Sequence, residues 1–165
     1  MVDNKDRMLV AFDGSPASLR AARLAFDLAG QIGGTVRLLA VLTDDEAGRL
    51  IDRFGPGHGT ARERRKKDLS SGIDYAVRIG QDLGLAVESV VRTAANAAEP
   101  FDKILSEADG WGAGWIFMGR TSTRGPRRAL LGSQTSHVLE FSRIPVVVVP
   151  AGPVDPVRGR GQEQS

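Results

Sequence analysis

The sequence contains no cysteine. This absence excludes a disulfide scaffold, a thiolate metal site and a cysteine nucleophile. No run of about 18 consecutive apolar residues occurs, as a membrane-spanning helix would need, and the N-terminal stretch MVDNKDRMLVAF lacks the long apolar segment of a secretory signal. We therefore expect a cytoplasmic protein that has no membrane partner.

A large excess of charge of one sign is also lacking. The 165 residues include 22 basic and 20 acidic side chains, a formal net charge of +2. This balance is weak support for a nucleic-acid partner, and we predict none. The length suits one domain, which we place at residues 1–150, and we expect the polar, Pro- and Gly-rich residues 151–165 to form a flexible tail.

Two common phosphate-binding motifs are missing as well. No Gly-Lys-Ser/Thr occurs, which excludes a Walker A loop. No G-x-G-x-x-G follows the first apolar run, which excludes the Rossmann fingerprint.

What is present is an alternation of short apolar runs with amphipathic segments. The apolar runs predict strands at residues 7–12, 35–42, 85–93, 115–119 and 144–150. Periodicity and capping signals predict helices at residues 15–33, 60–83, 99–112 and 127–142, with an excursion over residues 43–60. In the first helix, Ser15 is the expected N-cap, Pro16 the first helical residue and Gly33 the stop signal.

Strands that alternate with long helices predict a parallel sheet covered by helices on both faces. The runs LLAVL and PVVVV are apolar without alternation, as expected for strands that are buried on both faces. Right-handed crossovers then leave a few possible strand orders. The predicted fold is a doubly wound α/β fold with a five-stranded parallel sheet.

Two loops are candidates for a ligand site, because doubly wound sheets bind ligands at the carboxyl ends of their strands, where the strand order reverses. One is Asp13-Gly14-Ser15, after the first strand, and the other covers residues 119–134, after the fourth. If the first and fourth strands are neighbours, the two loops face each other.

The second loop has the composition of an anion site. Gly132-Ser133 opens or nearly opens a helix, and free N–H groups at a helix start attract anions. Glycines allow close backbone approaches that other residues resist, and they are Gly119, Gly125 and Gly132. Arginine can hold two phosphate oxygens at once, and the loop has Arg120, Arg124, Arg127 and Arg128.

In these segments the chain resembles the universal stress proteins. The family opens with an apolar strand and Asp-Gly-Ser, as in MLVAFDGSPASLRAARLAFDLA, and closes as in IFMGRTSTRGPRRALLGSQTSHVLEFSRIPVVVVP. Its nucleotide-binding branch carries G-x2-G-x9-G-[S/T], a spacing that Gly119, Ser122, Gly132 and Ser133 keep. The resemblance covers residues 7–150 and is specific at both ends, but not over residues 43–85.

The resemblance implies the strand order 3-2-1-4-5, which makes the first and fourth strands neighbours. It implies a homodimer joined along the last strand, residues 145–149, where pairing would cover an exposed apolar edge. It also implies ATP or a related adenine nucleotide as the ligand, with Mg²⁺ as its companion ion.

Roles for individual residues follow from the resemblance. Asp13 would lie near the ribose and phosphates, directly or through a divalent metal ion, and the backbone of Val41 would contact adenine. Arg120 is our own addition, because the family often has a small hydroxyl residue there. The rest of the implied cofactor-binding set is Ala11, Ser15, Gly119, Ser122, Gly125, Gly132, Ser133, Gln134 and Thr135.

Ser122 departs from the family pattern, which has glycine at that position. If the position requires φ > 0, a non-glycine residue costs about 1–2 kcal/mol, and about 1.4 kcal/mol is tenfold in affinity. If the Cβ of Ser122 points at the phosphates, it blocks them instead. The segment VRTAANAAEP, residues 91–100, likewise lacks the glycine of the family element V-x2-G-x-P.

Simpler interpretations exist for the same residues. Asp13 and Ser15 can serve only as caps of the first helix, and the arginines can form a solvated patch. If Arg127 and Arg128 lie in the first turn of the fourth helix, they oppose its macrodipole by about 0.3–1 kcal/mol each, and a bound anion would relieve that cost.

The sequence leaves three functions open. The first is a stress-response regulatory homodimer that binds ATP or a related adenine nucleotide. The second is a protein of the same family, from the branch that binds no nucleotide and acts through protein contacts. The third is a slow ATP hydrolase, for which Asp13 is the one visible candidate base and no accompanying acid is evident.

Overall fold

The computed structural model describes residues 4–43, 60–96, 99–120 and 132–150. Its helices and strands, in chain order, are β1 (Arg7–Ala11), α1 (Pro16–Ile32), β2 (Thr35–Thr43), α3 (Thr60–Asp82), β3 (Ala86–Ala94), α4 (Pro100–Trp111), β4 (Trp115–Gly119), α5 (Ser133–Phe141) and β5 (Val146–Val149). The predicted tail, residues 151–165, and most of the predicted excursion lie outside the described residues.

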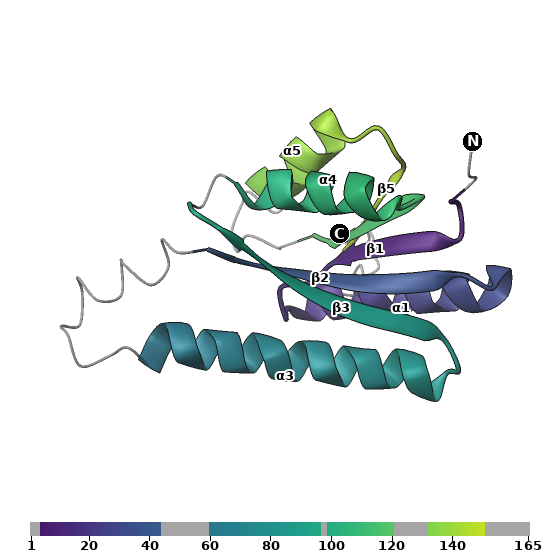
Figure 1. Ribbon diagram of the computed structural model, residues 1–165, viewed down its shortest axis with the longest axis horizontal. Coiled ribbons are helices and arrows are strands. Elements are labelled where there is room, and N and C mark those ends of the chain that lie inside the picture. Colours follow the sequence, from purple (N-terminus) through teal and green to yellow (C-terminus); the bar gives the residue numbers. More distant parts are fainter. Residues whose placement is uncertain (1–3, 44–59, 97–98, 121–131, 151–165) are drawn as a thin grey trace, which may run out of the picture.

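The strands form one parallel sheet in the order β3-β2-β1-β4-β5 (Figure 1). β1 pairs with β2 on one side, with Val10 opposite Leu38, and with β4 on the other, with Val10 opposite Phe117. The strand order reverses between β1 and β4, so the predicted order and the predicted switch point are both confirmed.

Helices cover both faces of the sheet. α1 and α3 lie on one face, and α4 and α5 lie on the other (Figure 1). Alternate residues of β1 supply the two cores: Met8 and Val10 pack with α1 and α3, whereas Leu9 packs with α4 and α5. All three are fully buried, which explains why the strand is an uninterrupted apolar run.

α1 begins and ends where the sequence predicts. The Oγ of Ser15 accepts a hydrogen bond from the backbone N–H of Ser18 at 3.1 Å, and Pro16 is the first helical residue. Gly33 ends the helix in the left-handed conformation, with φ = 71°, and its N–H donates to the carbonyl of Ala29. Both signals are local in the sequence, so tertiary structure is not needed to recognise them.

The predicted start of the last helix is wrong. The helix was expected over residues 127–142, but α5 begins at Ser133, because its N-cap Gly132 is extended with φ = −60° and ψ = 154°. Glycine is a poor residue for a helix interior, so a break at this position is favoured. Arg127 and Arg128 lie outside the described residues, and the first turn of α5 is made of Ser133 and the residues that follow it.

The two edges of the sheet differ in length. β3 forms one edge with nine residues, and β5 forms the other with four half-buried valines. In the described ranges, no helix is both long and apolar enough to cross a bilayer.

Candidate functional site

A pocket of about 210 Å³ opens at the carboxyl ends of β1, β2 and β4. This is the place that the switch-point rule predicts. The residues that line it are Ala11, Phe12, Asp13, Ser18, Leu39, Val41, Pro100, Ile104, Met118, Gly119, Gln134 and Thr135.

One side of the pocket is apolar. Leu39 and Met118 come from the strands and Ile104 comes from α4, and each is at least 95% buried. Val41, at the carboxyl end of β2, extends this surface. Pockets for flat organic ligands are commonly lined in this way, with a few polar groups that fix the orientation.

The structure brings about half of the predicted site residues together. Ala11, Asp13, Val41, Gly119, Gln134 and Thr135 all line the pocket. Four others are described but do not contribute to the lining, and they are Ser15, Arg120, Gly132 and Ser133. Ser122 and Gly125 lie outside the described residues. Both alternatives for Ser122, a strained backbone and a steric block, therefore stay predictions.

The N-terminus of α1 is closed by its own side chains. Asp13 Oδ1 accepts a hydrogen bond from the N–H of Ser15 at 2.9 Å, and Ser15 Oγ accepts one from the N–H of Ser18. The hydroxyl of Ser18 in turn donates to the carbonyl of Ser15 at 2.9 Å. The turn passes through Gly14, whose φ of 79° suits glycine. Asp13 and Ser15 therefore both take part in capping α1.

The N-terminus of α5 is built differently. Gly132 is its N-cap, none of the described side chains caps the helix, and the first turn has no acidic residue. Gln134 and Thr135, in that turn, line the pocket. The first N–H groups of a helix lack intrahelical partners and carry a partial positive charge. This end of α5 is consequently suited to an anion.

Gln134 also has a structural role. Its Oε1 accepts a hydrogen bond from the backbone N–H of Phe101 at 2.8 Å, which ties the start of α5 to the start of α4. Gln134 belongs to the cofactor-binding set that the resemblance implies, but its side-chain oxygen makes a contact within the fold. The hydrogen bond fixes where the first turn of α5 meets the pocket.

Gly119 is required by the packing of α1 on β4. A Cβ built on Gly119 would lie 2.5 Å from the carbonyl carbon of Ala17 and 2.5 Å from the N of Ser18. No backbone atoms approach a real Cβ that closely, so the first turn of α1 can rest there only on a glycine. The N–H of the next residue, Arg120, donates to the carbonyl of Val149 and joins the end of β4 to β5.

Several lining residues were not predicted. They are Phe12, Ser18, Leu39, Pro100, Ile104 and Met118. Pro100 is the first residue of α4, which the sequence placed correctly, but the position of α4 over the sheet is a tertiary property. A signal was available for Phe12 and Ser18, because they flank the Asp13-Gly14-Ser15 loop.

Among the described residues that line the pocket, Asp13 is the one with an acidic side chain. Across the described ranges, no cluster of three or more His, Asp or Glu side chains could hold a metal. Mg²⁺ at nucleotide sites usually takes one or two carboxylates and completes its shell with phosphate oxygens and water. Asp13 fits that protein share, because only its Oδ1 is used in the hydrogen bond to Ser15.

A relative in sequence and several solved structures are similar to this chain. The chain is 28% identical over 151 residues to the universal stress protein YxiE of Bacillus subtilis, covering 87% of this chain and 98% of the relative. The universal stress protein UspA of Lactobacillus plantarum superposes with a TM-score of 0.68 at 18% identity, over 87% of this chain and 96% of that one.

Two further neighbours were solved with ligands. A universal stress protein of Archaeoglobus fulgidus in complex with dAMP has a TM-score of 0.60 at 21% identity, covering 88% of this chain and 97% of that one. A universal stress protein in complex with cAMP has a TM-score of 0.59 at 19% identity, covering 90% and 98%. The family model for the universal stress protein family matches residues 5–150, and the chain therefore belongs to that family.

Proposed function

We propose that this chain is a stress-response regulatory protein that binds an adenine nucleotide, ATP or a related one, in the pocket at the ends of β1, β2 and β4. The observation that carries the proposal is the uncapped N-terminus of α5, which meets a pocket with an apolar side. A nucleotide needs both features, because its base is largely apolar on its faces and its phosphates are anionic.

The neighbours with bound ligands support adenine as the base. They were solved in complex with dAMP and cAMP, each a single-phosphate adenine nucleotide. In this chain the base would lie against Val41, Leu39 and Ile104, and the phosphates would lie at the first turn of α5 beside Thr135. Asp13 would hold a magnesium ion that travels with a polyphosphate. The metal would neutralise phosphate charge, while these side chains fix the position of the ligand.

We also propose a homodimer joined along β5. The strand is at the sheet edge, and all four of its valines are half-buried in the single chain. An apolar edge of this kind favours pairing with another strand. Sedimentation velocity tests this point, and a monomer at all concentrations would contradict it. A proline in place of Val148 is expected to weaken the dimer, because it removes a backbone donor that faces the open edge. The neighbouring Val149 faces β4, since its carbonyl accepts from the N–H of Arg120.

Calorimetry with nucleotide-stripped protein tests the binding proposal. We expect saturable heat with AMP and with ATP plus Mg²⁺, and weaker binding of GTP, which carries a different base. If millimolar ATP with Mg²⁺ gives no heat, the proposal is wrong.

A second candidate is a family member that binds no nucleotide and acts through protein contacts. Two observations favour it. The pocket volume of about 210 Å³ is below the roughly 300–1,000 Å³ of common ligand pockets, and the N-terminus of α1 is already occupied by its own side chains. Mass spectrometry of small molecules released from the purified protein separates the candidates, since a retained nucleotide would exclude the second.

A further inference from the structure

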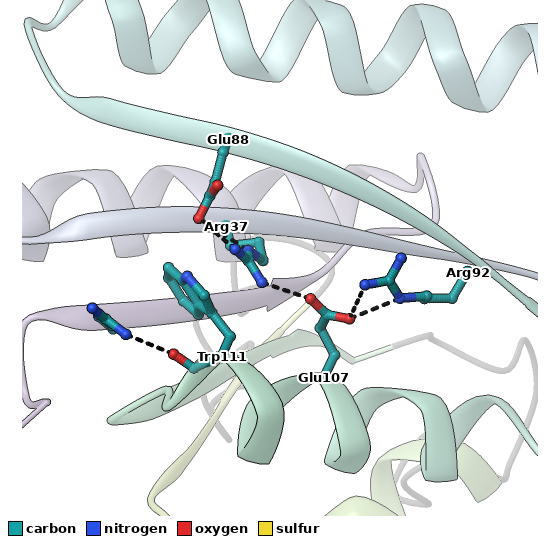
Figure 2. A network of polar contacts seen from close by, with 6 residues as sticks. Arg37, Glu88, Arg92, Glu107 and Trp111 are labelled. Atoms are coloured by element: carbon teal, nitrogen blue, oxygen red, sulfur yellow. Dashed lines mark hydrogen bonds and ion pairs between the residues drawn. The ribbon is translucent and has the colours of Figure 1, made fainter.

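A second cavity lies on the α4 side of the sheet. Its volume is about 460 Å³, and it shares no lining residue with the pocket described above. Arg37 and Arg92 line it from β2 and β3, and Glu107 and Trp111 line it from α4 (Figure 2). Lys103 lines it from α4 as well. Three of these five side chains are cations, so the cavity has the composition of an anion site.

Glu107 is the buried acid of this cavity, with 7% of its surface exposed. Its Oε1 accepts a hydrogen bond from Arg37 Nη1 at 2.7 Å, and its Oε2 accepts one from Arg92 Nε at 2.8 Å (Figure 2). Each oxygen has an arginine partner, which offsets the cost of burying the carboxylate. Glu107 thereby holds both guanidinium groups at the cavity.

Arg37 is fixed from two more directions. Its Nη2 pairs with Glu88 Oε1 at 2.9 Å, and its Cζ lies 4.4 Å from the centre of the Trp111 ring. The backbone carbonyl of Trp111 accepts a hydrogen bond from Arg7 Nη1 at 2.7 Å. These contacts keep Arg37 in one position and leave it little freedom to follow a ligand.

Arg92 is more available than Arg37. Its side chain is 49% exposed, and it uses Nε and Nη2 on a single oxygen of Glu107. A guanidinium has five N–H donors, so Arg92 has donors left for a second acceptor. The cavity therefore has one arginine that is locked in place and another that can bind.

Positive charge exceeds negative charge at this cavity. Arg37, Arg92 and Lys103 stand against Glu88 and Glu107, and within the described part of the chain Lys103 forms no ion pair. Ser106, one turn further along α4, lines the cavity and adds a hydroxyl donor. We propose that this cavity binds the phosphate group of a small molecule through Arg92, Lys103 and Ser106. Three donor groups from two elements match the three acceptor oxygens of a phosphate monoester.

The two tryptophans of the chain provide the readout. Trp111 lines the cavity, whereas the indole Nε1 of Trp115 donates to the carbonyl of Lys5 at 3.0 Å and lies outside it. Inorganic phosphate, added at constant ionic strength, is expected to shift the indole ¹H–¹⁵N signal of Trp111 along a saturable curve and to leave that of Trp115 in place. A Trp115→Phe variant assigns the two signals. An unmoved Trp111 signal overturns the proposal, as does acetate that shifts it equally at equal concentration.

Variants locate the binding. Lys103→Gln is expected to weaken phosphate about tenfold, through the loss of one charge-assisted contact. Lys67→Gln makes the same charge change on α3, at the opposite face, and is expected to have no effect. Gly110→Glu is expected to abolish binding, because Gly110 lines the cavity, an added Cβ there meets no atom within 4 Å, and the new acid would repel phosphate. Wild-type affinity in Lys103→Gln overturns the proposal.

The inference does not rest on nucleotide binding. A Gly132→Asp variant, which alters the start of α5 in the other pocket, is expected to leave the Trp111 titration unchanged. If that variant removes the Trp111 shift, phosphate binds at α5 and the proposed second site is wrong. The two sites can therefore fail separately.

Discussion

Two helices, α1 and α5, begin at the same pocket, but they differ in the capping of their N-termini. At α1, Ser15 and Asp13 accept hydrogen bonds from backbone N–H groups. At α5, Gly132 stands at the equivalent N-cap position and offers no side chain. Both helix N-termini carry the same partial positive charge, so they differ in which groups neutralise that charge. At α1 the protein's own side chains do so, whereas among the described residues no side chain does so at α5.

The difference in capping bears on which helix N-terminus would contact the phosphates of a ligand. The Asp13-Gly14-Ser15 loop, which a motif search would select first, is largely occupied with capping. Under the proposed function, the start of α5 contributes more to anion binding than the start of α1 does. If the comparison is correct, changes at α5 should affect ligand affinity, and changes at α1 should affect stability.

The largest expected effect, on ligand affinity, comes from capping the N-terminus of α5 with an acidic side chain. Gly132→Asp places a carboxylate where it accepts from the first N–H groups of the helix and repels phosphate. The dihedral angles of Gly132, φ = −60° and ψ = 154°, are open to any residue, so the fold should tolerate the change. We expect a loss of about 3 kcal/mol in nucleotide binding, roughly a hundredfold, measured by calorimetry.

Gly132→Asn serves as the partner variant. Asparagine caps as well as aspartate but carries no charge, so it separates occupation of the N–H groups from repulsion. We expect an intermediate affinity for Gly132→Asn. Full wild-type affinity in both variants would show that α5 does not contact the phosphates.

The next largest effect is on stability, at the contact between β4 and α1. Gly119→Ala forces a Cβ against the backbone of Ala17 and Ser18, and we expect a loss of about 1–3 kcal/mol. At this chain length the melting temperature falls by about 2–4 °C per kcal/mol. Gly110→Ala, where an added Cβ meets nothing within 4 Å, is the matched control and should be neutral or stabilising. Equal melting temperatures for the two would contradict the packing role of Gly119.

Removal of the N-cap of α1 should have a smaller effect on stability. Ser15→Ala removes the oxygen that accepts from the N–H of Ser18, and loss of an N-cap costs about 1 kcal/mol. We expect thermal unfolding to report this loss while nucleotide affinity stays the same. Ser71→Ala, at an exposed position within α3, is the control and should not destabilise. A large drop in affinity for Ser15→Ala would mean that α1 takes part in binding after all.

The smallest effect concerns the metal ion. Asp13→Asn keeps an oxygen acceptor for the N–H of Ser15 but loses the charge that would attract Mg²⁺. Because Asp13 is exposed, we expect about 0.4–1 kcal/mol, or a two- to fivefold weaker binding of ATP with Mg²⁺. Affinity for AMP without Mg²⁺ should not fall. An equal loss for both ligands would assign Asp13 to the nucleotide itself rather than to a metal.

The parts of the fold that sequence predicts are those with local signals. The cap at Ser15, the stop at Gly33 and the apolar strand around Val10 each depend on a few neighbouring residues. The alternation of strands and helices, with right-handed crossovers, limited the sheet to a few doubly wound orders, and the resemblance to a family selected one of them. The predicted start of α5 was wrong because the sequence RRALL has the composition of a helix. In the structure Gly132 is extended, and α5 begins at Ser133.

The parts that could not be predicted depend on contacts between distant residues. Arg37 interrupts an apolar strand and Glu107 lies on the buried side of α4, so each is noticeable in the sequence. Their hydrogen bond joins positions 70 residues apart, and no local pattern specifies it. The apolar wall of the pocket has the same origin, because Ile104 reaches it only through the docking of α4 on the sheet.

The packing of α1 on Gly119 has a consequence for comparing relatives. A lineage that lost its ligand would still need glycine there, because substitution would push α1 away from β4. Position 132 carries no such constraint on its dihedral angles, so drift could replace that glycine once no anion had to be accommodated. Among descendants with this fold, the residue at 132 should therefore distinguish binders from non-binders, whereas the residue at 119 should not.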